Sequence, residues 1–212
     1  MSKRNNNIEE QISFKIITLG DSQVGKTSII KRYLENKFTY ESTLTVGFIK
    51  SKKKIILKNK MNIFLELCDT SGQERYASLS TQYVKNADAV LFVFDLNNKK
   101  SFNNIKNWMK FFKDNTNSEN NMPTYLIGNK KDLEKNVEDD EIEIFKDEHK
   151  DIIYKETSAK EEDNQIEELF REMGELLYDK YKKNPHKNKS NKRNLSKYDE
   201  NKRGCPISKC IV

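Results

Sequence analysis

The chain contains few of the residues that mark secreted, zinc-binding or membrane-spanning proteins. Its 212 residues include 3 cysteines and 2 histidines. These provide neither a disulfide framework nor the pattern of a zinc site. No apolar run is long enough for a transmembrane helix, and no hydrophobic signal region opens the chain. A cytosolic protein is therefore expected.

The net positive charge of the chain is concentrated near its end. The net charge is +6, and residues 182–212 alone hold ten Lys/Arg against two Asp/Glu. The preceding part is therefore close to neutral. Helical periodicity stops after Lys183, where Asn, Lys and Ser dominate. We expect a flexible N-terminus over 1–11, one folded domain over 12–182, and a disordered basic tail over 183–212.

Strand-like and helix-like patterns alternate within the folded part. Alternation of this kind predicts an α/β domain, with a mostly parallel six-stranded sheet covered by helices on both faces. Helical spacing from Phe102 to Phe112 has Ser101 as its expected N-cap, and a second helical stripe runs from Ile166 to Leu177. The expected strands are Phe14–Leu19, Phe48–Leu57, Ile63–Cys68, Ala89–Asp95, Thr124–Asn129 and Ile152–Glu156, with the second and third paired as a hairpin that turns at residues 58–60.

Residues 20–27 read GDSQVGKT, which fits the pattern G-x-x-x-x-G-K-[ST]. The motif follows an apolar strand and opens a helix, the context in which such a loop holds nucleotide phosphates. Its glycines bring backbone N–H groups close to the phosphates, Lys26 supplies a point charge, and the Thr27 hydroxyl is suited to Mg²⁺. The predicted phosphate-binding residues here are Gly20, Ser22, Gln23, Val24, Gly25, Lys26, Thr27 and Ser28.

Two later loops indicate which base is bound. Residues 128–132 read GNKKD, and residues 156–160 read ETSAK. The Asp132 carboxylate can accept two hydrogen bonds from the N1–H and N2–H₂ edge of guanine, which adenine lacks. Backbone N–H groups of the second loop can reach the guanine O6. The predicted guanine-binding residues of these loops are Asn129, Lys130, Asp132, Ser158, Ala159 and Lys160.

A third motif, DTSGQE at residues 69–74, directly follows a strand. Asp69 can hold magnesium through water, and the Gly72 N–H can sense the γ-phosphate. Gln73 can orient the attacking water and is the expected catalytic residue. A strand-end cap and a solvated loop are the simpler interpretations of Asp69 and Gln73, and the joint occurrence of the motifs argues against both.

The four motifs together resemble those of the Ras-like small GTPases, and within them the Rab proteins. The resemblance extends from about Phe14 to Tyr181, and the Rab assignment depends on residues 74–79, residues 101–104 ahead of Trp108, and the cysteine-bearing tail. It implies a P-loop GTPase that cycles between GTP-bound and GDP-bound states, hydrolyses GTP slowly, needs Mg²⁺ and regulates vesicle traffic. A Ras-superfamily signalling protein outside Rab, and a nucleotide-binding scaffold with little hydrolysis, remain alternatives.

Family spacing also assigns the first switch segment. A magnesium-binding threonine eighteen residues after Thr27 is Thr45, which also faces the phosphate, and an aromatic residue seven positions earlier, Phe38, packs against guanine. Thr43 remains the competing choice. Where Rab proteins have Asp, Phe and Trp, this chain has Ile49, Lys50 and Cys68. Because these departures fall on the surface that effectors read, they bear on partners and not on nucleotide chemistry.

The resemblance implies several partners and a membrane site. They are a guanine nucleotide exchange factor, a GTPase-activating protein, effectors and, if the chain is prenylated, a GDP-dissociation inhibitor. Cys210, with Cys205 as a second candidate, is the expected lipid site, although Lys209 breaks the C-a-a-X pattern. Lipid plus basic tail would hold the protein on the cytosolic face of a membrane. A solvated tail with free thiols is the alternative.

Two further functions are disfavoured by the sequence. An ATP-using P-loop enzyme would have no use for Asp132 or for the loop at 158–160. A nucleic-acid binder would need aromatic side chains interleaved with the basic ones of the tail, which has only Tyr198. Without such a stacking platform, no nucleic-acid partner is expected.

Overall fold

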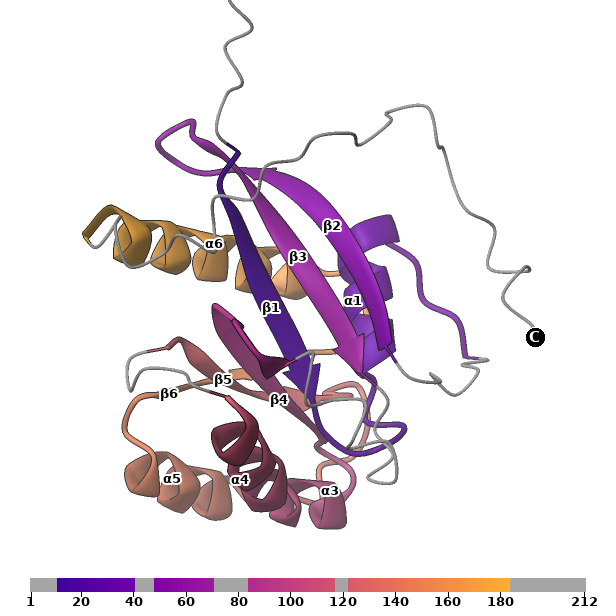
Figure 1. The fold of residues 1–212 in the computed structure, drawn as a ribbon. Coiled ribbons are helices and arrows are strands. Elements are labelled where there is room, and N and C mark those ends of the chain that lie inside the picture. Colours follow the sequence, from indigo (N-terminus) through magenta and orange to yellow (C-terminus); the bar gives the residue numbers. More distant parts are fainter. Residues whose placement is uncertain (1–10, 41–47, 71–83, 117–121, 184–212) are drawn as a thin grey trace, which may run out of the picture.

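The computed structural model describes residues 11–40, 48–70, 84–116 and 122–183 (Figure 1). Within these residues a single sheet has six strands, in the order β2-β3-β1-β4-β5-β6. Only β2 and β3 pair in antiparallel fashion, as a hairpin, and the other neighbours are parallel. The predicted mostly parallel α/β sheet is confirmed. Its strands are β1 (Ser13–Leu19), β2 (Phe48–Ile56), β3 (Asn62–Thr70), β4 (Ala89–Asp95), β5 (Thr124–Asn129) and β6 (Ile152–Glu156).

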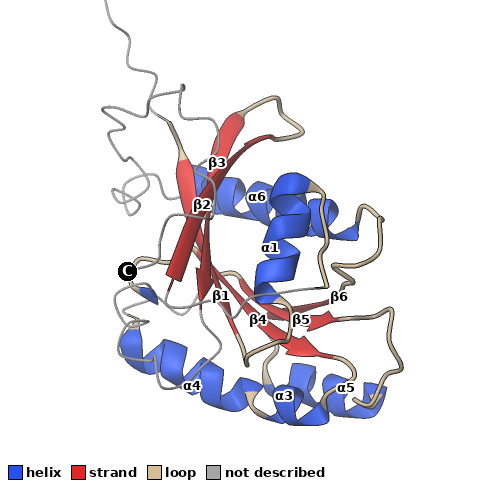
Figure 2. Cartoon of the chain, turned by 90° about the vertical axis from the view of Figure 1, so that its right-hand side faces the viewer, coloured by secondary structure: helices blue, strands red, loops and turns tan. Residues whose placement is uncertain are grey.

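Helices cover both faces of this sheet, as Figures 1 and 2 show. One layer holds α1 (Lys26–Glu35) and α6 (Gln165–Lys183). The opposite layer holds α3 (Lys99–Asn103), α4 (Ile105–Asn115) and α5 (Asp139–Glu148). Because a parallel strand is buried on both faces, β4 reads as an uninterrupted apolar run, and all seven of its residues are buried.

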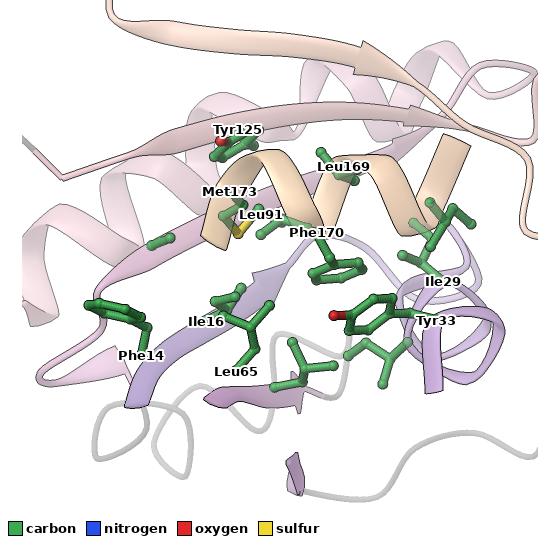
Figure 3. Close-up of a cluster of buried hydrophobic side chains, with 14 of the residues drawn as sticks. Phe14, Ile16, Ile29, Tyr33, Leu65, Leu91, Tyr125, Leu169, Phe170 and Met173 are labelled. Carbon is green, nitrogen blue, oxygen red and sulfur yellow. The ribbon is translucent and has the colours of Figure 1, made fainter. Parts of the chain in front are cut away.

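Two hydrophobic cores follow from this arrangement, one under each helical layer. In the core under α1 and α6, Tyr33 stacks on Phe170 with ring centroids 4.1 Å apart (Figure 3). In the other core, Phe92 and Phe94 of β4 pack against Phe112 and Phe102. Cys68 lies in this second core and is fully buried, as expected of a core residue.

Local signals placed most elements correctly but misread one helix. The β2–β3 turn lies at residues 58–60 as predicted, with Lys60 in the left-handed region at φ 64°. Ser101 is not an N-cap. The cap is Asn98, whose side chain accepts a hydrogen bond from the Ser101 N–H, and the helical run breaks at Asn104 into α3 and α4. The helix therefore starts three residues earlier than predicted.

Candidate functional site

The described parts of the predicted motifs lie together at the carboxyl ends of the parallel strands. Strands β1, β3, β4, β5 and β6 run parallel, so their carboxyl ends lie together. The loop at residues 20–27 follows β1, and Asp69 lies at the end of β3. The two guanine motifs follow β5 and β6. Open α/β sheets bind their ligands at the carboxyl ends of their strands.

Two glycines of the phosphate loop are required by its geometry. Gly20 has φ +146°, and a Cβ there would lie 2.1 Å from the Val93 carbonyl oxygen on β4. Gly25 has φ +97°, and a Cβ there would lie 2.2 Å from the Asn129 Nδ2. Both positions therefore combine a left-handed backbone with contact against a neighbouring strand end or loop. The loop sits tightly on β4 and β5 only because no side chain intervenes.

Lys26 is buried at the first turn of α1, with 5% of its surface exposed. Its Nζ donates to the Gly20 carbonyl at 2.9 Å and to the Asp21 carbonyl at 2.7 Å. Burial lowers the pKa of Lys26 to about 8, and the carboxylates of Asp69 and Asp21 oppose that shift. The carbonyls of the loop thus hold the Lys26 ammonium group in place.

Thr27 and Asp69 meet beside Lys26. The Thr27 hydroxyl donates to the Asp69 Oδ2 at 2.7 Å, and Asp69 is 3% exposed. A hydroxyl and a carboxylate brought together in this way are oxygen ligands of the kind that Mg²⁺ prefers. The donor set of these two residues therefore fits the ion that the sequence predicts.

Asn129 joins the phosphate loop to both guanine loops. It is 1% exposed, its Nδ2 donates to the Val24 carbonyl at 2.9 Å, and its Oδ1 accepts from the Thr157 hydroxyl at 3.2 Å. These contacts brace the loop after β1 against the loop after β6. Because both bonds are buried, losing either would leave an unpaired polar group.

The side chains proposed to read the base lie side by side. The Ser158 hydroxyl donates to the Asp132 Oδ1 at 2.6 Å, and the Lys160 Nζ lies 3.6 Å from the Asp132 Oδ2. The Asp132 side chain is 13% exposed, so its carboxylate is mostly shielded from water. Lys130, in the left-handed region at φ 64°, forms an ion pair with Asp95 at 2.6 Å. This pair anchors its ammonium group at the end of β4.

Phe38 lies at the start of the predicted first switch. It is partly buried against the core under α1 and α6, and its ring meets Tyr40 edge-on at 5.1 Å. The Lys160 Nζ lies 5.7 Å from the centre of the Tyr40 ring, so this segment neighbours the second guanine loop. The remaining predicted residues, Thr45, Gly72, Gln73, Cys205 and Cys210, and the alternative Thr43, lie outside the described residues.

Two polar contacts that hold the site were not predicted from the sequence. The Asp21 Oδ1 accepts hydrogen bonds from the Asn104 Nδ2 and the Trp108 Nε1, both at 2.7 Å. Arg32 of α1 donates to the Ala159 carbonyl at 2.9 Å. Each contact spans more than eighty residues of sequence, so no local pattern could have revealed it.

Two departures from the Rab pattern lie on strand β2 of the β2–β3 hairpin. Ile49 is 51% exposed, and the Lys50 Nζ pairs with the Glu66 Oε2 at 2.6 Å. Glu66 is almost fully buried and also accepts from the Ser13 hydroxyl. Lys50 therefore supplies the charge that a buried carboxylate needs. Among the helices that the structure describes, none is long and apolar enough to cross a membrane.

Comparison of the sequence with known proteins identifies the family of this chain. Residues 15–179 match the Ras family. The chain is 36% identical over 183 residues to Ras-related protein Rab-32D of Dictyostelium discoideum, covering 83% of this chain and 78% of that protein. It is 38% identical over 161 residues to Ras-related protein Rab-13 of Rattus norvegicus, covering 74% and 76%. It is 36% identical over 171 residues to Ras-related protein SEC4 of Saccharomyces cerevisiae, covering 80% and 77%.

The fold, the position of the motifs and these similarities agree. A match over most of the chain favours the Rab type over a signalling protein outside Rab or a nucleotide-binding scaffold with little hydrolysis. The chain therefore belongs to the Ras family, as a Rab-like small GTPase that binds and hydrolyses GTP and regulates vesicle traffic.

Proposed function

We propose that the loops at the carboxyl ends of the parallel strands bind guanine nucleotide through three cooperating parts. Residues 20–28 hold the phosphates, residues 129–132 and 158–160 hold the base, and Phe38 flanks it. The observation that carries this assignment is Asn129, whose one side chain bonds to both the Val24 carbonyl and Thr157. Phosphate and base sites are thereby set at a fixed spacing, as a single nucleotide requires.

Magnesium is the proposed cofactor, held by Thr27 and Asp69 and, in the GTP state, by Thr45. Bound there, the ion would offset negative charge on the β- and γ-phosphates. Thr27 and Asp69 support this role because they already lie within hydrogen-bond distance of each other. The Thr27 hydroxyl could keep that hydrogen bond while ligating the ion, because it donates its hydrogen to Asp69 and its oxygen lone pairs remain available.

Hydrolysis would depend on positioning more than on proton abstraction. Lys26, fixed by the carbonyls of Gly20 and Asp21, would stabilise the charge that develops on the transferred phosphoryl group. Gln73 would orient the attacking water, with the Gly72 N–H on the γ-phosphate. Ser22 is small and leaves room beside the phosphate for an arginine from an activating protein. Such a partner raises turnover by about 10³–10⁵ in related enzymes.

A Gln73→Leu variant tests the catalytic assignment. Phosphate release is measured in single turnover, with and without an activating protein. We expect GTP affinity to be nearly unchanged and stimulated turnover to be lost, because leucine cannot orient water. Unchanged stimulated turnover would show that another group positions the nucleophile.

The membrane role is also a proposal. Residues 12–182 would form the nucleotide-binding domain, and residues 183–212 a basic tail carrying the lipid on Cys210, on Cys205, or on both. Each basic residue close to an anionic leaflet adds about 1 kcal/mol of attraction, so tail and lipid act together. Exchange factor, activating protein, effectors and GDP-dissociation inhibitor would then control the cycle on the cytosolic face of an intracellular membrane.

The lipid assignment has a direct test. The full chain is localised in cells beside a Cys205→Ser, Cys210→Ser double variant, and the intact mass of each is measured after expression with prenylating enzymes. We expect the unaltered chain to gain the mass of a prenyl group and to sit on membranes, and the double variant to do neither. An unmodified mass for the unaltered chain would remove the anchor from the account.

A further inference from the structure

Arg32 occupies an unusual position for a cation. It lies on the inner side of α1 with 5% of its surface exposed. The carboxylate with which it forms an ion pair, that of Glu162, is 3.9 Å away and 85% exposed, so that pair is weak. Its guanidinium instead donates to backbone oxygens: Nε to Ala159 at 2.9 Å and Nη2 to Lys160 at 3.1 Å. Burying a guanidinium costs free energy, which these bonds must offset.

The two carbonyls that Arg32 holds belong to peptide units that are fixed at both ends. The unit between Ala159 and Lys160 directs its N–H to the Ser158 Oγ at 3.2 Å. The next unit, between Lys160 and Glu161, directs its N–H to the same oxygen at 3.1 Å. Arg32 and the Ser158 hydroxyl therefore bind opposite sides of the same short stretch of backbone.

The chain of bonds continues to the residue that reads the base. The Ser158 hydroxyl donates to the Asp132 Oδ1 at 2.6 Å. Every bond runs in one sense, from the guanidinium through two amides and one hydroxyl to a carboxylate. In such a series each bond polarises the next and strengthens it. A serine hydroxyl rotates freely unless its partners decide its direction, and two N–H donors on its oxygen force its hydrogen toward Asp132.

We propose that Arg32 is a positioning residue for guanine recognition, acting through the Ala159–Glu161 backbone and the Ser158 hydroxyl on the Asp132 carboxylate. This inference rests on the proposed function, because it assumes that Asp132 binds the N1–H and N2–H₂ edge of the base. With Oδ1 held by Ser158, the carboxylate plane is fixed and its other lone pairs point in a set direction. The same guanidinium donates from Nη1 to the carbonyl and Oδ1 of Asn36, both at 3.1 Å, and so ties the end of α1 to this loop.

Lysine cannot replace arginine in this role. The guanidinium is planar, with donors in a rigid fork, and here it spans the carbonyls of Ala159, Lys160 and Asn36 at once. An ammonium group is a single point with three donors on a flexible stem. An Arg32→Lys variant therefore keeps the charge but loses the geometry.

The test compares GDP with inosine diphosphate, which lacks the exocyclic amino group that Asp132 would bind. Both nucleotides compete for the same purified full-length chain, so the ratio of their affinities does not depend on the fraction of active protein. We expect Arg32→Lys to reduce the preference for GDP about three- to tenfold, the effect of weakening one hydrogen bond. Lys37→Met, which removes an exposed charge close to Asn36, is the matched control and should keep the ratio.

A second break in the series makes the test specific. Ser158→Ala should reduce the preference by a similar factor, and the double variant Arg32→Lys, Ser158→Ala should show little further loss. If Arg32→Lys is too unstable to purify, Arg32→Gln takes its place with the same expectation. A preference unchanged by the Arg32 substitution but reduced by Ser158→Ala would overturn the proposal. An unaltered chain that binds ADP as well as GDP would refute the proposed function itself, and this inference with it.

Discussion

The contact between Asp21 and Trp108 allows a quantitative test of how the phosphate loop is anchored. The Asp21 carboxylate points away from the loop and accepts hydrogen bonds from the side chains of Asn104 and Trp108, near the start of α4. Through its backbone carbonyl the same residue accepts from the Lys26 ammonium. Asp21 therefore links Lys26 to the opposite helical layer.

The expected magnitude follows from the geometry. A hydrogen bond to a charged group contributes about 1.5–3 kcal/mol, and the two here are both 2.7 Å long. Trp108 is 8% exposed, so its indole N–H would be left nearly without water if the carboxylate were removed. We expect Asp21→Ala to lower the free energy of unfolding by about 2–4 kcal/mol, toward the lower value because the pair is only partly buried. GDP should also dissociate faster, because the carbonyl that holds Lys26 is less well fixed.

A double-mutant cycle isolates one arm of this contact. Asp21→Ala, Trp108→Phe and the double variant are unfolded in urea and followed by far-UV circular dichroism. The coupling energy should be about 1–3 kcal/mol, since the two groups touch directly. Lys110→Ala, an exposed residue on the same helix, serves as control. Because Trp108 is the single tryptophan of the chain, its emission gives an independent signal and should change in Asp21→Ala. Additive effects within about 0.5 kcal/mol would show that the contact does not anchor the loop.

Two further predictions concern the metal site and the core. Thr27→Asn should weaken Mg²⁺·GTP binding more than GDP binding, and equal losses in a nucleotide titration would argue against a metal role for Thr27. Tyr33→Phe should raise the free energy of unfolding by about 1 kcal/mol, because the buried Tyr33 hydroxyl finds no hydrogen-bond partner among the described residues. Burial, helped by Glu167, raises the pKa of Tyr33, so the folded state favours the neutral phenol. The stability that this raised pKa contributes is fully present below about pH 10 and is lost as the pH rises further, because the unfolded tyrosine then ionises. Urea titrations at pH 8 and 10.5 should therefore show a smaller fall in the free energy of unfolding for Tyr33→Phe than for the unaltered chain.

Much of the fold was predictable because its signals are local. The strands β4, β5 and β6 read as short apolar runs, and their bounds agree with the prediction to the residue. Helix α6 was predicted because its apolar residues recur at helical spacing from Ile166 to Leu177. The helix α5 was not predicted, since its core contacts are only Ile142 and Phe145 within an acidic, exposed segment. Three apolar residues in ten, of which Ile144 is exposed, are a weak periodic signal.

The candidate site was predictable in part for a related reason. Asp132 and Ser158 were predicted as guanine-binding residues from their motifs, and these motifs lie together because they follow neighbouring parallel strands. Their bond to each other, and the Asn129 bridge to Val24, agree with that expectation. Arg32 and Asp21 could not be given roles from the sequence because their partners lie on other elements. Their importance depends on tertiary packing, which local spacing does not encode.

The most direct measurement is equilibrium binding of GDP and ADP to the purified full-length chain with Mg²⁺ present. The paired donors of guanine match the carboxylate of Asp132, whereas adenine would leave that shielded group unpaired. We predict a preference for GDP of about 10⁴, as found where a buried polar group rejects the wrong ligand. Similar affinities for the two nucleotides would contradict the account at its centre.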